Sequence, residues 1–243
     1  MKNKRLDYLD NIRWITVVLV IIYHIIYLFN NSGVISNIGV KGIQIMDTFL
    51  IFVYPWFMCL LFIVSGISCN YSLRKRSNKE FIKDRAKRIL LPSVLGIFIY
   101  GWISGFITAQ YTDMFAGNGN NIPGFIKYFI YSLMGIGPLW FCHVLFIGSL
   151  LIVLIRKIDK KEKINNLCKK INLLILFILV LLVWGSSFIL NTPLITVYRF
   201  GIYLFMMLLG YYVFSNQELI KKLEKISIQL SLISVVTGIC YVY

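Results

Sequence analysis

Seven long apolar runs, separated by short polar loops, constrain this chain of 243 residues more than any other feature. A helix rises about 1.5 Å per residue, so about 20 apolar residues cross the hydrocarbon core of a bilayer. The sequence therefore predicts an all-α, polytopic bundle of about seven transmembrane helices in a lipid bilayer, with residues 1–243 forming one membrane-embedded domain. The runs cover roughly Ile12–Phe29, Thr48–Cys69, Ile89–Ala109, Phe125–Ile155, Ile171–Leu190, Thr196–Phe214 and Ile226–Tyr243.

Glycine and proline mark two local features of these runs. The fourth run is longer than one span needs, and Gly135-Ile136-Gly137-Pro138 predicts a break, with a helix from Pro138 onward and an interfacial stretch before it. In the third run, Gly101 and Gly105 form a G-x-x-x-G pair, which allows another backbone to approach closely.

The charged residues indicate topology rather than a nucleic-acid partner. Charged residues make up 14% of the chain, against about 25% in a typical soluble domain. A net charge of +15 would suggest nucleic acid in a soluble protein, but here the basic residues lie in short loops. All but three of the 25 lysine and arginine residues lie in the N-terminal stretch and in the second, fourth and sixth loops, the exceptions being Lys41, Lys127 and Arg199. This alternation predicts a multi-pass protein of the cell membrane with a cytoplasmic N-terminus.

The end of the sequence leaves the extent of the protein open. The chain stops within its seventh apolar run and has no polar tail after it. We therefore expect a chain that is truncated at its C-terminus.

The first helix contains three ionisable residues with helical spacing. His24 follows Arg13 by eleven residues, so the two side chains share one face and lie about 16 Å apart along the axis. Asp10 precedes Arg13 by three residues, within reach of an ion pair. An ionisable residue inside a membrane span indicates a functional site, and a neutral imidazole can accept a proton from a hydroxyl nucleophile. Alternatively, Arg13 extends to the inner interface and His24 is a hydrogen-bonded packing residue.

A second group of basic residues begins the third run. Arg85 and Arg88 are three residues apart, so they can point the same way, and guanidinium groups match phosphate oxygens in pairs. The alternative is that both serve only as topology signals.

A third group is Gly137-Pro138-Leu139-Trp140-Phe141-Cys142-His143. Trp140 fits an anchor at the membrane interface. With only two histidines and no carboxylate at ligand spacing, we expect no zinc and no other metal. Phosphate-loop, G-x-S-x-G and G-x-G-x-x-G patterns are absent from the sequence. The cysteines form no C-x-x-C pair, so we interpret them as small buried residues.

Taken in order, these motifs resemble the integral-membrane acyltransferase family 3, which transfers acyl groups to carbohydrates and cell-surface polymers. Four elements carry the resemblance, and Leu209-Gly210-Tyr211 is a weaker fifth. They are Leu9-Asp10-Asn11-Ile12-Arg13 with His24, Phe62-Ile63-Val64-Ser65-Gly66, Arg85-Ala86-Lys87-Arg88 with Pro92, and Leu139-Trp140-Phe141.

The resemblance implies a role for each site residue. His24 would be the catalytic base, with Arg13 as its basic partner and Asp10 beside it. Arg85 and Arg88 would hold a cytoplasmic acyl-CoA, with acetyl-CoA as the expected donor. An acetyl or succinyl group would pass to a hydroxyl of a carbohydrate or cell-envelope acceptor, either through an acyl-histidine or after deprotonation of the acceptor by His24.

Two other functions stay open on the sequence. A transporter or flippase subunit would show broken helices at corresponding places in two halves, whereas only Gly135–Pro138 breaks a run. The second function is that of a non-catalytic membrane scaffold. The short length of the chain favours it, because members of the resembled family have more helices. The resemblance thus also implies a domain incomplete at its C-terminal end.

Overall fold

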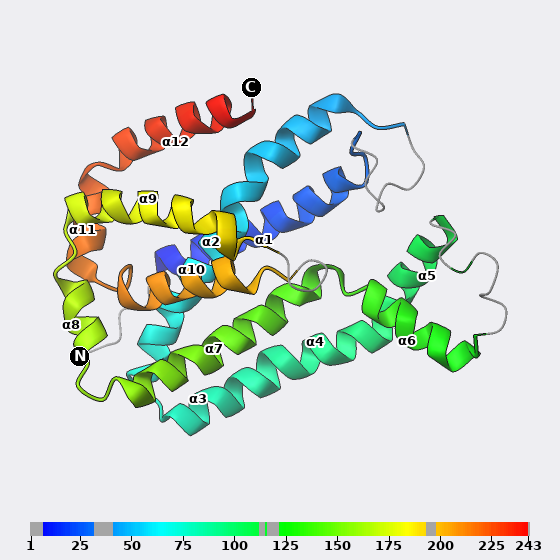
Figure 1. The fold of residues 1–243 in the computed structure, drawn as a ribbon, viewed down its shortest axis with the longest axis horizontal. Coiled ribbons are helices and arrows are strands. Elements are labelled where there is room, and N and C mark those ends of the chain that lie inside the picture. Colours follow the sequence, from blue (N-terminus) through cyan, green and yellow to red (C-terminus); the bar gives the residue numbers. More distant parts are fainter. Residues whose placement is uncertain (1–6, 32–40, 112–114, 116–121, 193–197, 243) are drawn as a thin grey trace.

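The computed structural model describes residues 7–31, 41–111, 115, 122–192 and 198–242, and every regular element in this part is a helix. The helices are α1 (Asp7–Tyr27), α2 (Gln44–Leu73), α3 (Asn78–Arg85), η1 (Ala86–Leu90), α4 (Leu91–Gly96), η2 (Ile97–Gly101), α5 (Trp102–Tyr111), α6 (Gly124–Met134), η4 (Gly137–Leu139), α7 (Trp140–Ile158), α8 (Lys163–Lys169), α9 (Leu173–Leu190), α10 (Phe200–Tyr212), α11 (Gln217–Lys225) and α12 (Ser227–Val242). The predicted all-α, polytopic membrane bundle is confirmed (Figure 1).

All seven apolar runs contain a helix, but not all of them form a full span. Five helices are long and apolar enough to cross a membrane, or six if α11 and α12 count as one span bent by 74°. The described part of the sixth run is α10, whose 13 residues reach about 20 Å, less than the hydrocarbon thickness. The beginning of that run, residues 196–197, lies outside the described residues. An apolar run in the sequence therefore does not always form a helix that is long enough to cross the membrane.

The third span is one continuous rod that contains two wide turns. The helices α3, η1, α4, η2 and α5 together cover Asn78–Tyr111. Within the rod, η1 and η2 are π-helical, each five residues long. Such turns change the rotation between residues on either side and are frequent at functional sites.

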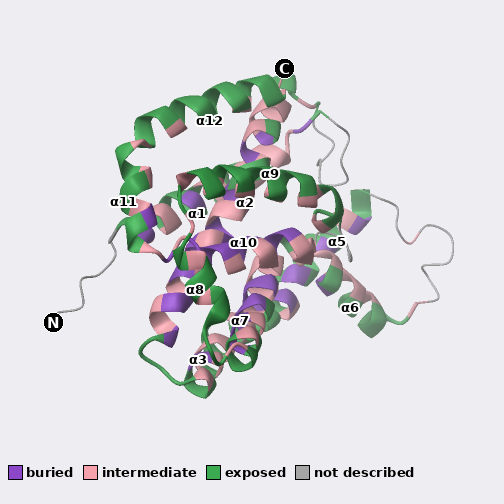
Figure 2. Ribbon diagram, turned by 60° about the vertical axis from the view of Figure 1, so that its left-hand side comes forward, coloured by how far each residue is buried: buried purple, intermediate pink, exposed green. Residues whose placement is uncertain are grey.

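The core of the bundle forms around α2. This helix packs against α10, α1 and α7, and its Phe57 and Phe62 are almost completely buried. In Figure 2 the buried residues gather on α2, α7 and α10, whereas α9 and α12 have no buried residue and are largely exposed. Apolar residues on α9 and α12 that no protein segment covers are suited to lipid.

Glycines allow the closest contacts between helices. A Cβ atom at Gly66 of α2 would lie 2.8 Å from the backbone nitrogen of Tyr211, and one at Gly210 of α10 would lie 2.9 Å from the Cα of Ile63. The predicted role of the G-x-x-x-G pair is also confirmed, because Gly101 and Gly105 face the backbone of α6. Contacts this close exclude any larger side chain.

The predicted break in the fourth run is confirmed. The helix α6 ends at Met134, Gly137 has a φ of +48°, and α7 begins at Trp140. A positive φ is readily adopted only by glycine, so Gly137 is suited to this turn. As a result, α6 lies across α5 while α7 returns along the bundle (Figure 1).

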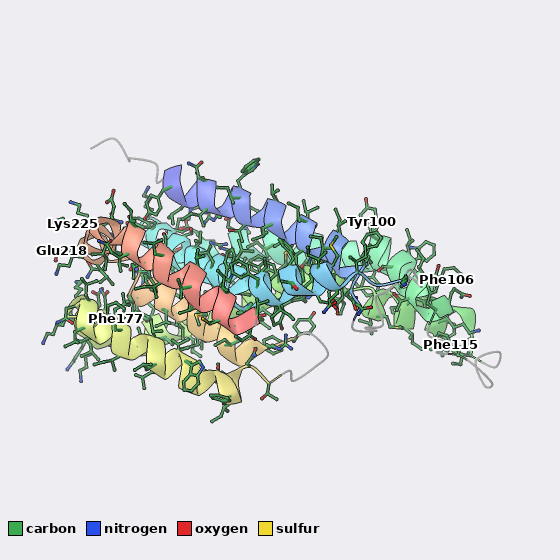
Figure 3. All side chains as sticks on the ribbon, turned by 90° about the horizontal axis from the view of Figure 1, so that it is seen from above. Tyr100, Phe106, Phe115, Phe177, Glu218 and Lys225 are labelled. Carbon is green, nitrogen blue, oxygen red and sulfur yellow. The ribbon has the colours of Figure 1, made fainter. Side chains whose placement is uncertain are left out.

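The charged segments gather at one end of the molecule. The helices α3, α8 and α11 lie toward the same end in Figure 1. Figure 3 shows Glu218 and Lys225 of α11 at the opposite end from Tyr100 and Phe106. The N-terminal basic residues Lys2, Lys4 and Arg5 lie outside the described residues. The segregation of charge agrees with the topology expected from the loops, and the cytoplasmic location of this end stays a prediction.

Candidate functional site

Arg13 joins the first helix to the second. Its Nη1 atom lies 3.4 Å from Asp10 Oδ1, as the three-residue spacing predicted. Its Nη2 atom donates a hydrogen bond to Ser68 Oγ on α2, and Ser68 Oγ in turn donates to the carbonyl of Val64 over 2.9 Å. The Arg13 side chain, 39% exposed, is thus directed toward α2. Ser68 was missed from the sequence, where its only signal was a hydroxyl inside an apolar run.

Arg85 approaches the same turn of α2 from the other side. Its Nη2 atom lies 3.6 Å from Cys69 Sγ, and its guanidinium carbon lies 5.1 Å from the centre of the Phe81 ring. Cys69 is completely buried and follows Ser68 directly. Arg13 and Arg85 are near enough for their positive charges to act on each other. The fold therefore brings two predicted site residues, from the first and third spans, to neighbouring positions on the second.

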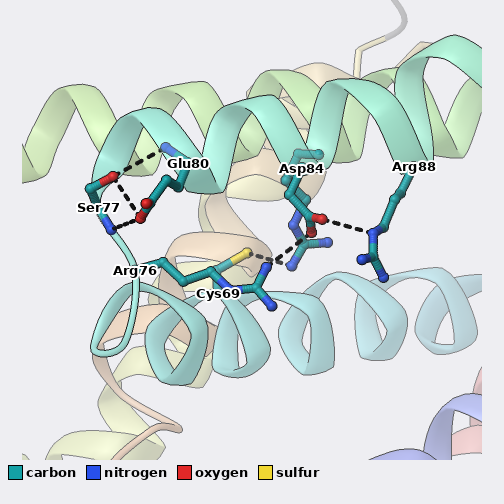
Figure 4. Close-up of polar contacts among 7 residues, drawn as sticks. Cys69, Arg76, Ser77, Glu80, Asp84 and Arg88 are labelled. Carbon is teal, nitrogen blue, oxygen red and sulfur yellow. Dashed lines mark hydrogen bonds and ion pairs between the residues drawn. The ribbon is translucent and has the colours of Figure 1, made fainter.

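Arg88 does not join Arg85. Its Nε atom lies 2.7 Å from Asp84 Oδ1, and the other oxygen of Asp84 lies 3.1 Å from Arg76 Nη1 (Figure 4). The Arg88 side chain is 75% exposed, whereas that of Arg85 is partly buried. The π-helical turn η1 begins directly after Arg85, so the expected three-residue alignment is not kept. A ligand would thus meet Arg85 in a partly buried position and Arg88 in an exposed one.

A capping box determines where this basic segment becomes helical. Ser77 Oγ accepts a hydrogen bond from the Glu80 backbone nitrogen at 3.2 Å, and Glu80 Oε2 accepts one from the Ser77 backbone nitrogen at 3.0 Å (Figure 4). The two bonds satisfy backbone donors at the start of α3 that have no partner within the helix. This start places Arg85 beside Cys69.

His24 lies near the far end of α1. Its Nδ1 atom is 2.7 Å from the carbonyl oxygen of Val20. A carbonyl oxygen only accepts, so Nδ1 carries a proton, and in a neutral ring Nε2 then holds the lone pair. Within the described residues no hydrogen-bond partner lies at Nε2. Because α1 is continuous, His24 stays about 16 Å along the axis from Arg13, and the fold does not bring them together.

The Leu-Trp-Phe motif packs against the second-helix motif. The centre of the Trp140 ring lies 6.4 Å from that of Phe62 and 5.1 Å from that of Tyr203, and the centre of Phe141 lies 4.9 Å from that of Phe62. Trp140 is therefore partly buried against the core, because Pro138 and Gly137 turn the start of α7 toward α2 and α10, and its role as an interface anchor stays a prediction. Two motifs of the sequence thus meet at one aromatic cluster.

His143 lies beside this cluster. Its Nδ1 atom is 2.8 Å from the hydroxyl of Tyr198, and the two rings stack. Its Nε2 atom is buried and has no hydrogen-bond partner in the part of the chain that the structure describes. Within the same residues, no three histidine, cysteine, aspartate or glutamate side chains gather as a metal site.

Comparison with known proteins adds one match. A family model described as an acyltransferase domain, of the acyltransferase 3 type, matches residues 6–243, which is almost the whole chain. No curated protein and no solved structure matches the chain.

Proposed function

We propose that this chain, which belongs to the acyltransferase 3 family, moves an acetyl or succinyl group from cytoplasmic acyl-CoA to a hydroxyl of a carbohydrate or cell-envelope polymer. The family establishes a membrane acyltransferase in general, and the several membrane-spanning helices agree with it. The donor, the acceptor and the roles of individual residues are the proposal. A cell membrane is the proposed location, because it separates cytoplasmic acyl-CoA from envelope acceptors.

The contact between His24 Nδ1 and the Val20 carbonyl is the observation that carries this proposal. With Nδ1 donating to Val20, the lone pair of Nε2 is directed away from the helix backbone. In the proposed step, Nε2 takes the proton of the acceptor hydroxyl as the oxygen attacks the acyl carbon. The new ester C–O bond forms, the thioester C–S bond breaks, and the CoA thiolate leaves with the electron pair of that bond. The imidazolium then returns its proton to the thiolate.

The arginines are proposed to hold the donor. Guanidinium groups bind phosphate oxygens through paired hydrogen bonds. Arg85 has one weak contact to sulfur and stacks on Phe81, so most of its five donors are available to a ligand. Arg13 stands next to it through Ser68 and Cys69. Arg88 is mostly exposed and its charge is paired with Asp84, so Arg85 is proposed as the principal phosphate ligand of the two.

The separation along α1 constrains how the reaction is arranged. A donor that is held by its phosphates near Arg13 and Arg85 must extend its thioester about 16 Å toward His24. The acceptor would then arrive from the opposite side of the membrane. This arrangement would carry the acyl group through part of the bilayer without moving the nucleotide.

The test is transfer of label from acyl-labelled CoA to envelope carbohydrate in membranes that contain the chain. His24→Gln keeps a side-chain donor for the Val20 carbonyl but has no basic nitrogen, so transfer should stop while the protein still inserts. Ile25→Ala is the matched control, since Ile25 is the next residue and is 54% exposed toward lipid. Unreduced transfer by His24→Gln would exclude His24 as the base and leave it as a packing residue.

A further inference from the structure

A small, partly open cavity lies at the charged end of the bundle, where α2, α7 and α10 end. Its wall includes Asn70 and Arg74 at the end of α2, Arg156 at the end of α7, and Tyr211 and Tyr212 at the end of α10. Its volume is about 110 Å³. Pockets that enclose whole small molecules are about 300–1,000 Å³, so this one suits a single chemical group of a larger ligand.

Two arginines of the cavity have no carboxylate partner among the described residues. The guanidinium carbon of Arg74 lies 5.2 Å from the centre of the Tyr71 ring. Arg156 Nη1 donates to the carbonyl of Leu73 over 2.8 Å, which holds the side chain at the C-terminal end of α2. Each guanidinium has five N–H donors, so both retain donors for a further acceptor.

The acidic residues of the cavity wall, Asp159 and Glu162, accept hydrogen bonds from the start of α8. The two oxygens of Asp159 accept hydrogen bonds from the backbone nitrogens of Lys163 and Ile164, each at 2.9 Å. Glu162 Oε2 accepts a bond from Asn165 Nδ2 at 3.2 Å. These hydrogen bonds hold the start of α8 in place, and neither carboxylate forms an ion pair with Arg74 or Arg156 in the described part of the chain.

Asn70 provides an acceptor for a ligand, whereas the arginines provide donors. It is only 8% exposed, and its Nδ2 atom donates to the carbonyl oxygen of Tyr211 over 2.9 Å. Because a carbonyl oxygen only accepts hydrogen bonds, the amide nitrogen of Asn70 must face it. The amide oxygen, Oδ1, therefore points the other way. Oδ1 is buried without a hydrogen-bond partner in the described part of the chain. Buried acceptors are rarely left unpaired, so a ligand in this cavity should present an N–H or O–H donor to Oδ1.

From these contacts we propose that the cavity binds a phosphate ester that has an N–H or O–H donor close to the phosphate. The phosphate would lie between Arg74 and Arg156, and the donor would reach Asn70 Oδ1. Two sources have this chemistry at a membrane surface: the nucleotide end of coenzyme A, and the head group of phosphatidylethanolamine. Neither Arg85 nor Arg88 lines the cavity, so this site is separate from the one proposed above.

The experiment measures binding to the full chain in nanodiscs of phosphatidylcholine, whose head group has a phosphate but no N–H or O–H donor. One arm titrates coenzyme A, and the other replaces part of the lipid with phosphatidylethanolamine, each followed by the thermal unfolding midpoint. We expect one of the two probes to raise the midpoint. Arg74→Gln should weaken that binding about tenfold, because it removes one charge-assisted hydrogen bond.

Lys75→Gln is the matched control, since it removes the same charge from the adjacent exposed residue. An effect of Arg74→Gln on coenzyme A alone assigns the cavity to a soluble nucleotide, and an effect on phosphatidylethanolamine alone assigns it to lipid. Equal weakening by Arg74→Gln and Lys75→Gln, or no response to either probe, would overturn the proposal. Coenzyme A binding that Arg85→Gln abolishes and Arg74→Gln leaves intact would also overturn it, while agreeing with the proposed acyl transfer.

Discussion

The guanidinium group of Arg13 on α1 donates a hydrogen bond to the hydroxyl of Ser68 on α2. The next residue along α2, Cys69, contacts Arg85 of α3. One turn of the central helix therefore collects basic residues from two other spans. Ionisable residues within or beside a membrane span are expensive to bury and mark a functional site by default.

The contact between Arg13 and Ser68 should be measurable as a coupling energy. In a double-mutant cycle of Arg13→Ala and Ser68→Ala, the two changes should be non-additive by about 0.5–2 kcal/mol. The free energy of unfolding would be measured by steric trapping in bicelles. If Arg13 instead extends to the inner interface, the two effects will add, and the coupling will vanish.

Close packing of α2 on α10 makes Gly66 intolerant of a side chain. The Cβ of Gly66→Ala would meet the α10 backbone, including the Tyr211 nitrogen at 2.8 Å, so the free energy of unfolding should fall by about 1–3 kcal/mol. Gly185→Ala on α9 is the control, since a Cβ there has no neighbouring atom within 4 Å. The same unfolding measurement should give a change below about 1 kcal/mol for this control. Alanine favours a helix more than glycine does, so equal losses for the two variants would contradict the packing described here.

Trp140 should stabilise the bundle through its packing against the core. Trp140→Ala removes ring contacts to Tyr203 and Phe62 and should lower the free energy of unfolding by about 3–5 kcal/mol. Trp184 on α9 is 65% exposed, so Trp184→Ala should cost less than about 1 kcal/mol. A small effect of Trp140→Ala, comparable with that of Trp184→Ala, would contradict the packing described here.

Arg85 and Arg88 should differ in their effect on the donor. Arg85→Gln should raise the KM for acyl-CoA about tenfold, because a phosphate loses a charge-assisted hydrogen bond. Arg88→Gln should raise KM less, since Arg88 is mostly exposed and bonded to Asp84. Initial rates of label transfer at varied acyl-CoA provide the values, and Lys83→Gln on the exposed face of α3 is the control. The same KM in all three variants would mean that these charges act only on topology.

Much of the helix pattern could be predicted from the sequence because it depends on local properties. The apolar runs, the break at Gly135–Pro138 and the G-x-x-x-G contact all follow from hydropathy and from glycine and proline geometry. The spacing of Asp10 and Arg13 correctly predicted their ion pair, since helical rotation alone brings them together. Whether each run completes a span was less predictable, because it depends on where a helix bends.

The sequence by itself determined the class of protein, the helical segments and the residue types available for acyl transfer. Only the tertiary structure decided which of these residues meet across the bundle: Arg13 with Ser68, Arg85 with Cys69, and Trp140 with Phe62. Each of these contacts joins different helices. Hydropathy and helical period act along one segment, whereas contacts between helices depend on how several segments pack, and no single segment contains that information.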